Sequence, residues 1–296
     1  MKKKEINSSR MPVYRDSGFE LYNSELTADT FKKETENIRK PENYIYSRYR
    51  NPTVVSAEEA VMSLEGSNWA LLTQSGMSAI DIAVSIFQNG NTGRPWLFFS
   101  EIYGGSISFV ESILKTRRGL DIHYFNPKNG IYDLSELEKT VNSLKPELLY
   151  IESVSNPMLI VADVPSIAEI AKRYGCKVIL DNTFATPFLY KPLNDGVDIV
   201  LHSVTKYLSG HGNISAGVIC GNDEDLMHSA IEYRKFVGHM LSPDDAYRLE
   251  TQIKTFNLRF SRQCENAFRL AKLLSIHSAV ERSEEHTSEL QSRQSI

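Results

Sequence analysis

The chain has 296 residues, of which 41% are hydrophobic and 24% charged, as in an ordinary globular protein with one large domain and smaller pieces. Its net charge of −4 argues against a nucleic-acid surface, and no apolar run approaches the roughly 20 residues that a membrane-spanning helix needs. Three widely spaced cysteines argue against a disulfide framework or a zinc site and favour a cytoplasmic protein. The basic start MKKKEINSSR is followed by no apolar segment, so it does not resemble a secretory signal.

The first 43 residues are polar and weakly periodic, and we expect an N-terminal arm with a short helix near Ala28–Glu36. Beyond Pro52, helical patterns alternate with short apolar runs, and residues 68–87 combine a strand, a turn and a helix. The other expected helices cover 53–66, 106–119, 133–144 and 164–175. The other expected strands cover 94–100, 120–126, 146–153, 176–181, 198–203 and 215–221. From about Ser242 to Ser275 the pattern is strongly helical.

This alternation predicts an α/β fold with a mostly parallel, mixed sheet flanked by helices on both faces. The strands are continuous apolar runs, as expected when both faces of a sheet are covered. No internal repeat is present.

The last fifteen residues, RSEEHTSELQSRQSI, have no amphipathic face. They are compatible with a solvated tail, but RSEEHTSELQS also resembles a translated sequencing adapter. We therefore expect residues 281–296 to be non-native and the native sequence to be cut near Val280.

Polar side chains follow several of the predicted strands. In an open parallel sheet, ligands bind beyond the carboxyl ends of the strands, so these residues are expected at one edge. The set comprises Gln74–Met77, Glu101, Tyr103–Gly105, Ser155, Asn156, Asp181, Ser203, Thr205 and Lys206. Each residue alone has an ordinary structural interpretation, and only their expected position together at one edge of the sheet indicates a ligand site.

The turn at Ser75–Met77 opens a helix, and backbone N–H groups at a helix N-terminus favour a phosphate. Gly76 allows the ligand to approach the backbone closely. The hydroxyls of Ser203 and Thr205 can donate to the same anion. The alternative interpretations are a simple helix cap and ordinary turn residues.

Asp181 ends an apolar strand, where an unpaired charge is costly, and a protonated pyridine nitrogen would be a suitable partner. Tyr103, in a glycine-rich loop, could stack on a flat ring. Lys206, at a partly dry edge, could form a Schiff base with an aldehyde cofactor, because burial lowers the pKa of a lysine. The competing interpretations are a helix cap, rim packing and a solvated lysine.

Two other kinds of site are disfavoured. A dinucleotide site would need the pattern GxGxxG after the first strand, and the pattern is not found there. A metal site would need clustered ligands, but the seven histidines are scattered.

These residues resemble the pyridoxal-phosphate enzymes of cysteine and methionine metabolism: cystathionine γ-synthases, cystathionine lyases, methionine γ-lyases and O-acylhomoserine sulfhydrylases. The matching segments occur in family order over about residues 44–280. They are YSRYRNPT (46–53), TQSGMSAI (73–80), YGGS (103–106), ESVSNP (152–157), VILDNTFATP (178–187), HSVTKYLSGHGN (202–213) and LSPDDAY (241–247). The lysine segment and DNTFATP are the most specific.

The resemblance implies fold type I of the pyridoxal-phosphate enzymes, the aspartate-aminotransferase-like fold, with pyridoxal 5′-phosphate as cofactor. It assigns Lys206 and Tyr103 as catalytic, with Lys206 forming the Schiff base and moving protons. The other expected cofactor contacts are Asp181 at the ring nitrogen, Asn156 at the phenolic oxygen, and Gly76, Met77, Ser203 and Thr205 at the phosphate.

The resemblance also implies that Tyr46 and Arg48 reach the phosphate in a neighbouring subunit, since the planar fork of arginine matches phosphate oxygens. A shared site requires a dimer, and the family is usually a dimer of dimers. The implied organisation is an arm over 1–53, a cofactor-binding domain over 54–245, the start of a truncated C-terminal domain over 246–280, and the tail.

The implied function is making or breaking a C–S bond at the β or γ carbon of a sulfur amino acid or homoserine ester. A cystathionine γ-synthase or γ-lyase is expected, with an O-acylhomoserine sulfhydrylase or a methionine γ-lyase as the alternative and a non-catalytic relative as a third possibility. Gly105 stands where methionine γ-lyases carry cysteine. The family's substrate-binding arginine comes from the C-terminal domain, and neither Arg259 nor Arg262 is an evident substitute.

Overall fold

The computed structural model describes residues 9–33, 38–88 and 93–280. Its centre is a seven-stranded sheet in the order β1-β7-β6-β5-β4-β2-β3. Among these strands only β7 runs antiparallel to its neighbours, β1 and β6. The strands are β1 (Trp69–Thr73), β2 (Trp96–Phe99), β3 (Ile122–Phe125), β4 (Leu148–Glu152), β5 (Lys177–Asp181), β6 (Ile199–His202) and β7 (Gly217–Gly221). The expectation of a mostly parallel, mixed sheet is confirmed.

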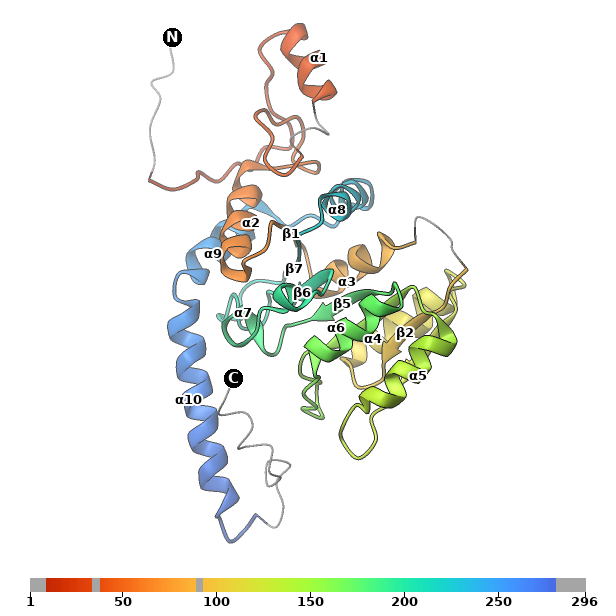
Figure 1. The fold of residues 1–296 in the computed structure, drawn as a ribbon. Helices are drawn as coiled ribbons and strands as arrows, with labels where there is room; N and C mark the ends of the chain where they lie inside the picture. Colours follow the sequence, from red (N-terminus) through yellow and green to blue (C-terminus); the bar gives the residue numbers. More distant parts are fainter. Residues whose placement is uncertain (1–8, 34–37, 89–92, 281–296) are drawn as a thin grey trace.

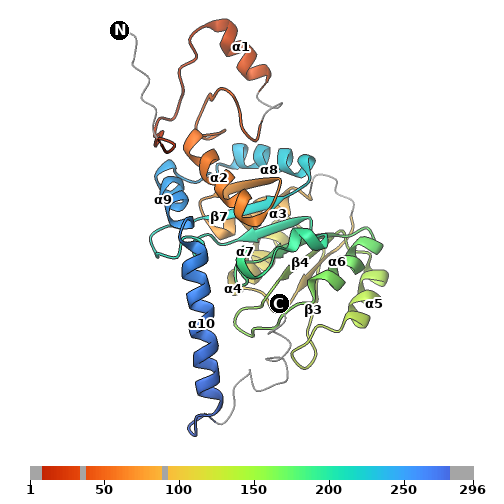
Figure 2. The same ribbon diagram turned by 60° about the vertical axis from the view of Figure 1, so that its left-hand side comes forward.

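Helices cover both faces of the sheet, as Figures 1 and 2 show. The chain first steps outward from β1 to β2 and β3, then returns to β4 and β5. Right-handed crossovers in opposite directions place the connecting helices on opposite faces. Accordingly α3 (Gly76–Ser85) packs with α4 (Gly104–Phe109) and α8 (Glu224–Val237), while α5 (Leu134–Leu144) packs with α6 (Val164–Arg173). Strands β1, β4 and β7 are buried along their whole length for this reason.

The N-terminal arm and the C-terminal helices lie at the side of the sheet that carries β1 (Figure 1). The remaining helical segments are α1 (Ser24–Lys32), α2 (Pro52–Glu65), a π-helical turn (Val110–Lys115), α7 (Thr186–Leu189), a 3-10 turn (Pro192–Asp195), α9 (Pro243–Ile253) and α10 (Phe256–Ser275). Helix α2 packs against α9 and β1, and α10 projects away from the sheet. No helix in the described ranges is both long and apolar enough to cross a bilayer.

Two local expectations are wrong. Helix α1 begins four residues early, because the side chain of Asn23 accepts from the backbone N–H of Leu26 and caps it; residues 34–36 of the expected helix lie outside the described residues. The expected helix 106–119 begins at Gly104 and becomes π-helical at Val110. The predicted helical region after Ser242 is confirmed, and it consists of two helices.

Helix α8 was not expected at all. Its ends nevertheless carry ordinary signals, since Asp223 caps the first turn and Gly238 adopts a left-handed conformation at the end. The predicted domain boundaries remain predictions, and the tail 281–296 lies outside the described residues.

Candidate active site

The start of α3 and the turn after β6 come together at the carboxyl edge of the sheet. Ser75 caps α3 by accepting from the backbone N–H of Ser78 at 3.0 Å. The N–H groups of Gly76 and Met77 belong to the first turn, so they have no partner within the helix. A Cβ atom on Gly76 would lie 3.1 Å from Cβ and Oγ of Ser203. Glycine therefore allows close contact between two elements that both offer donors to an anion.

Thr183 connects this region to Asp181. The backbone N–H of Ser203 donates to Oγ1 of Thr183 at 2.7 Å, and the N–H of Thr183 donates to Oδ1 of Asp181 at 2.9 Å. The ends of β5 and β6 are thereby held together. Thr183 lies within the segment DNTFATP and was not predicted as a site residue.

Asp181 is half-buried at the end of β5. Burial raises the pKa of this carboxyl group, although hydrogen bonds from Thr183 and the nearby His202 act in the opposite direction. No lysine or arginine forms an ion pair with Asp181 in the part of the chain that the structure describes. A cation placed here, such as a protonated pyridine nitrogen, would relieve this cost and lower the pKa again. The carboxylate fits the group that the sequence predicts.

Lys206 lies in the turn after β6, and its backbone is fixed. Its N–H donates to the carbonyl of Ser203 at 3.0 Å, and its own carbonyl accepts from Gly210 at 2.8 Å. The guanidinium of Arg259 on α10 donates to the carbonyls of Tyr207 and Leu208, each at 3.1 Å. Helix α10 thus supports the turn that carries the lysine.

The side chain of Lys206 is exposed in this single chain. The expectation of a partly dry edge around it is therefore wrong for the described residues. The physical reason is that the turn projects beyond the strand ends, and nothing described here covers the side chain.

Tyr103 and Asn156 follow the neighbouring strands β2 and β4. The ring of Tyr103 is 51% exposed and packs over Gly105, where a Cβ atom would meet Cε1 of the ring at 2.4 Å. The backbone N–H of Tyr103 donates to Oε1 of Glu152 at 2.7 Å. Asn156 is exposed, and its backbone N–H also bonds Glu152. Glu152 was not predicted as a site residue.

Thr205 is bonded within the chain. Its hydroxyl donates to the carbonyl of Ala216 at 3.1 Å and accepts from the N–H of Ala216 at 2.9 Å. The single hydroxyl proton is therefore engaged between the turn after β6 and the start of β7. Its predicted contact with a phosphate stays a prediction.

Tyr46 and Arg48 contact the arm and α8. The guanidinium of Arg48 lies 5.3 Å from the ring centre of Tyr46 and 5.1 Å from that of Tyr49, and it bonds the carbonyl of Lys235. None of these contacts involves Asp181 or Lys206. The expectation that both residues serve a neighbouring subunit stays a prediction.

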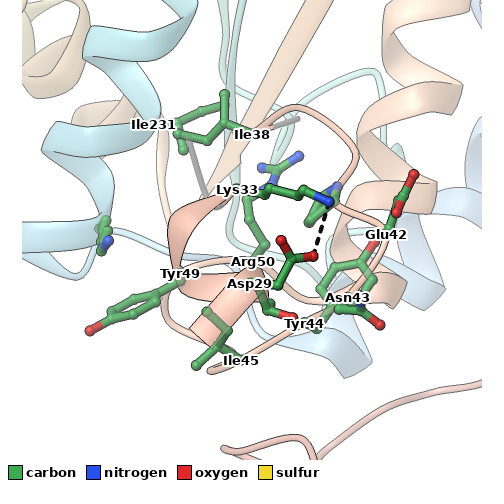
Figure 3. Close-up of a pocket in the computed structure, with 13 residues that line it drawn as sticks. Asp29, Lys33, Ile38, Glu42, Asn43, Tyr44, Ile45, Tyr49, Arg50 and Ile231 are labelled. Atoms are coloured by element: carbon green, nitrogen blue, oxygen red, sulfur yellow. Dashed lines mark ion pairs between the residues drawn. The ribbon is translucent and has the colours of Figure 1, made fainter. Parts of the chain in front are cut away.

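A pocket lies between the arm and α8, away from these strand ends (Figure 3). Tyr44, Tyr49, Arg50 and Ile231 are among the residues that line it, and the ion pair of Lys33 with Asp29, 2.9 Å long, lies beside it. None of its lining residues is a predicted cofactor contact. The arrangement of polar groups, rather than the pocket, marks the site.

Residues 1–288 match the family described as Cys/Met metabolism PLP-dependent enzyme. The chain belongs to this family. It is 34% identical over 257 residues to a cystathionine beta-lyase of Coxiella burnetii, covering 86% of the chain and 64% of that protein. It is 35% identical over 273 residues to an L-methionine gamma-lyase of Pseudomonas putida, covering 91% of the chain and 65% of that protein.

Solved structures show the same fold. A cystathionine gamma-lyase from Lactobacillus plantarum, complexed with L-serine, has a TM-score of 0.80 and 26% identity over 96% of this chain and 69% of that one. A cystathionine gamma synthase from Xanthomonas oryzae has a TM-score of 0.79 and 28% identity, covering 92% of this chain and 64% of that one. The chain therefore spans about two thirds of the length of such relatives. The predictions of fold type I and of pyridoxal phosphate as the cofactor are confirmed at family level.

Proposed function

We propose that the protein makes or breaks a C–S bond at the β or γ carbon of a sulfur amino acid or a homoserine ester. The leading candidate is a cystathionine γ-synthase or γ-lyase-like enzyme. The alternatives within the family are an O-acylhomoserine sulfhydrylase and a methionine γ-lyase. The names of the similar proteins support this reaction class, since they include cystathionine beta-lyase, methionine gamma-lyase and cystathionine gamma synthase.

One observation carries the proposal. Asp181 is a half-buried carboxylate that has no cationic partner in the described chain. It is joined through Thr183 to the turn at Ser203, and this turn contacts the N-terminus of α3. A cationic ring nitrogen fits the first group and a phosphate fits the second. Lys206 follows three residues after Ser203 and can supply the amine.

Each residue then has a distinct task. Pyridoxal phosphate, when bound, stabilises negative charge at the α carbon of an amino acid. Asp181 would hold the ring nitrogen, and the N–H groups of Gly76 and Met77 with the Ser203 hydroxyl would orient the phosphate. Tyr103 would pack on one face of the ring. The amine of Lys206, exposed and carried on a braced turn, would remove and return the α proton.

Gly105 bears on the choice of substrate. Because a Cβ atom at this position would overlap the Tyr103 ring, a cysteine here would require Tyr103 to move. The placement of the Tyr103 ring thus favours those enzymes of the family that carry glycine at position 105. It disfavours a methionine γ-lyase, although relatives of that name are equally similar in sequence.

We further propose a homo-oligomer with shared sites, a dimer of dimers. Tyr46 is 39% exposed, and the half-buried Arg48 lies over its ring, so the Tyr46 side chain is accessible from outside the chain. The contact of Arg48 with α8 holds this pair on the outside of the molecule.

The test of the site is spectroscopic. Purified protein with added pyridoxal phosphate should be yellow, and Lys206→Ala should abolish the Schiff-base absorbance while leaving the fold unchanged. Lys254→Ala, which removes another exposed lysine directly after α9, should keep the absorbance. A colourless wild-type protein after addition of the cofactor would contradict the proposal and favour a non-catalytic relative.

The substrate is tested with the complete enzyme, including whatever follows the described residues. Cystathionine and methionine should be assayed by release of thiol and 2-oxo acid. O-acylhomoserines should be assayed with cysteine or sulfide supplied as the incoming thiol, by release of the carboxylic acid. Turnover of none of them by a yellow protein would contradict the proposed reaction class while leaving the cofactor site intact.

A further inference from the structure

Glu152 is a buried acidic residue at the carboxyl edge of the sheet, with an exposed fraction of 7%. It ends β4 and is paired in register with Asp181 on β5. In a parallel sheet, paired residues direct their side chains to the same face. Two carboxyl groups therefore lie side by side at the point where a cationic ring nitrogen is expected.

The carboxyl group of Glu152 also connects two loops. It accepts the backbone N–H of Tyr103, which opens α4 after β2, at 2.7 Å. The backbone N–H of Asn156, in the loop after β4, also faces this carboxyl group and stabilises its charged form. These loops carry the residues proposed for the ring face and the phenolic oxygen. A single side chain thus sets the distance between two groups that would contact the same ring.

We propose that Glu152 is a positioning residue of the cofactor site, which holds the loops of Tyr103 and Asn156 together and shares the ring-nitrogen environment with Asp181. This inference rests on the proposed cofactor site. It adds a residue that contacts the cofactor only through others.

The electrostatics agree with the geometry. Burial, and then the adjacent Asp181, raises the pKa of Glu152 to about 8, although the two N–H groups act in the opposite direction. The titratable groups that face it are Asp181 on β5, Tyr150 on its own strand and Tyr132 of the segment before α5. At neutral pH Glu152 is then mostly protonated, so it can accept these N–H groups without adding a second negative charge beside Asp181.

Two variants separate the two tasks. Glu152→Gln keeps a carbonyl acceptor but cannot ionise, whereas Glu152→Leu removes the acceptor. Glu169→Gln, an exposed acidic residue on α6, serves as the matched control. The readouts are cofactor dissociation constants, the induced circular dichroism of the bound cofactor, and its absorbance from pH 6 to 10, the range around the pKa of about 8.

Glu152→Leu should weaken cofactor binding roughly tenfold or more, as expected when two N–H groups lose a charge-assisted or carboxyl acceptor, and should reduce the induced dichroism. Glu152→Gln should bind within about threefold of wild type and lose one pH transition of the cofactor spectrum. If Glu152→Leu does not fold, the Gln variant still decides, since retention of the full wild-type pH profile overturns the proposal.

The possible failures are distinguishable. A wild-type protein that forms no Schiff base contradicts the proposed function itself. A yellow wild type, together with a folded Glu152→Leu variant of unchanged affinity and dichroism, overturns the role of Glu152 alone.

Discussion

Two buried charge clusters of opposite sign lie on this chain. Around Glu58, which is 3% exposed, Arg50 and Arg234 each form an ion pair of 2.8 Å, so that two cations surround one carboxylate. At the carboxyl edge of the sheet, Glu152 and Asp181 form the reverse arrangement, with two acids and no lysine or arginine paired with them among the described residues.

The first cluster is complete within the chain. Arg234 also donates to the carbonyl of Leu72 at 2.8 Å, and the N–H of Leu72 donates to Glu58 at 3.0 Å. It therefore joins the arm, α2, β1 and α8 without any ligand. In the second cluster both carboxyl groups have raised pKa values, and neither forms an ion pair with a lysine or arginine among the described residues. The difference indicates that the first cluster stabilises the fold and that the second is prepared for a cation from outside.

The largest expected effect is on the first cluster. Glu58→Gln leaves two buried guanidinium groups without a counter-ion, which should lower the free energy of unfolding by about 3–5 kcal/mol. Urea denaturation measures this. Glu59→Gln, which removes a neighbouring acid in an exposed pair with Lys40, should change it by about 1 kcal/mol or less. If both substitutions changed the free energy of unfolding by the same small amount, the cluster around Glu58 would not stabilise the fold, and the proposed difference between the two clusters would be wrong.

The pH dependence of the cofactor-free chain probes the second cluster. The folded-state pKa of Glu152, about 8, lies above its ordinary value, so the native state binds more protons than the unfolded state between roughly pH 4.5 and 8. Stability should therefore fall as the pH rises through this window, by at most about 5 kcal/mol. Glu152→Gln should flatten the profile, and added pyridoxal phosphate should reduce the slope. A wild-type profile that rises over this range would be inconsistent with the raised pKa.

Asp181→Asn tests the cation directly. Loss of the charge opposite the ring nitrogen should weaken cofactor binding about 10- to 100-fold, or about 1.4–2.8 kcal/mol. Without cofactor, the variant should be at least as stable as wild type, because a half-buried acid has been removed. Asp225→Asn, at an exposed position on α8, should change neither property. Lower stability of the cofactor-free Asp181→Asn chain would mean that Asp181 has a structural partner.

The smallest expected effect concerns Thr205. Thr205→Val removes the two hydrogen bonds between the hydroxyl and Ala216 and should lower the stability of the cofactor-free chain by about 1 kcal/mol, whereas Thr205→Ser should restore it. Thermal unfolding with and without pyridoxal phosphate measures both states. If Thr205→Val is as stable as wild type without cofactor but binds the cofactor more weakly, the hydroxyl contacts the phosphate and does not stabilise the turn.

Much of the site could be predicted from the sequence. Asp181, Ser203 and Lys206 were found because polar residues directly after apolar strands must lie at one edge of a parallel sheet. Arg259 was considered only as a substrate ligand and instead braces the lysine turn. The roles of Glu152 and Thr183 were not predicted, because their partners are backbone N–H groups, which occur at nearly every position of any sequence.

The fold, like the site, could be predicted from the sequence only in part. The strands were predictable because burial on both faces leaves uninterrupted apolar runs. Helix α8 was missed, and Arg234 within it looks like an ordinary surface residue in the sequence although it is 2% exposed. Its burial depends on Glu58, 176 positions away along the chain.

By itself the sequence determined the alternation of strands and helices, the edge at which chemistry gathers and the family. Those properties follow from local periodicity and from residues that adjoin strand ends. Only the tertiary structure decided which charges meet their partners inside the chain and which lie beside a like charge. That decision depends on distances between segments far apart in sequence, which no local pattern encodes.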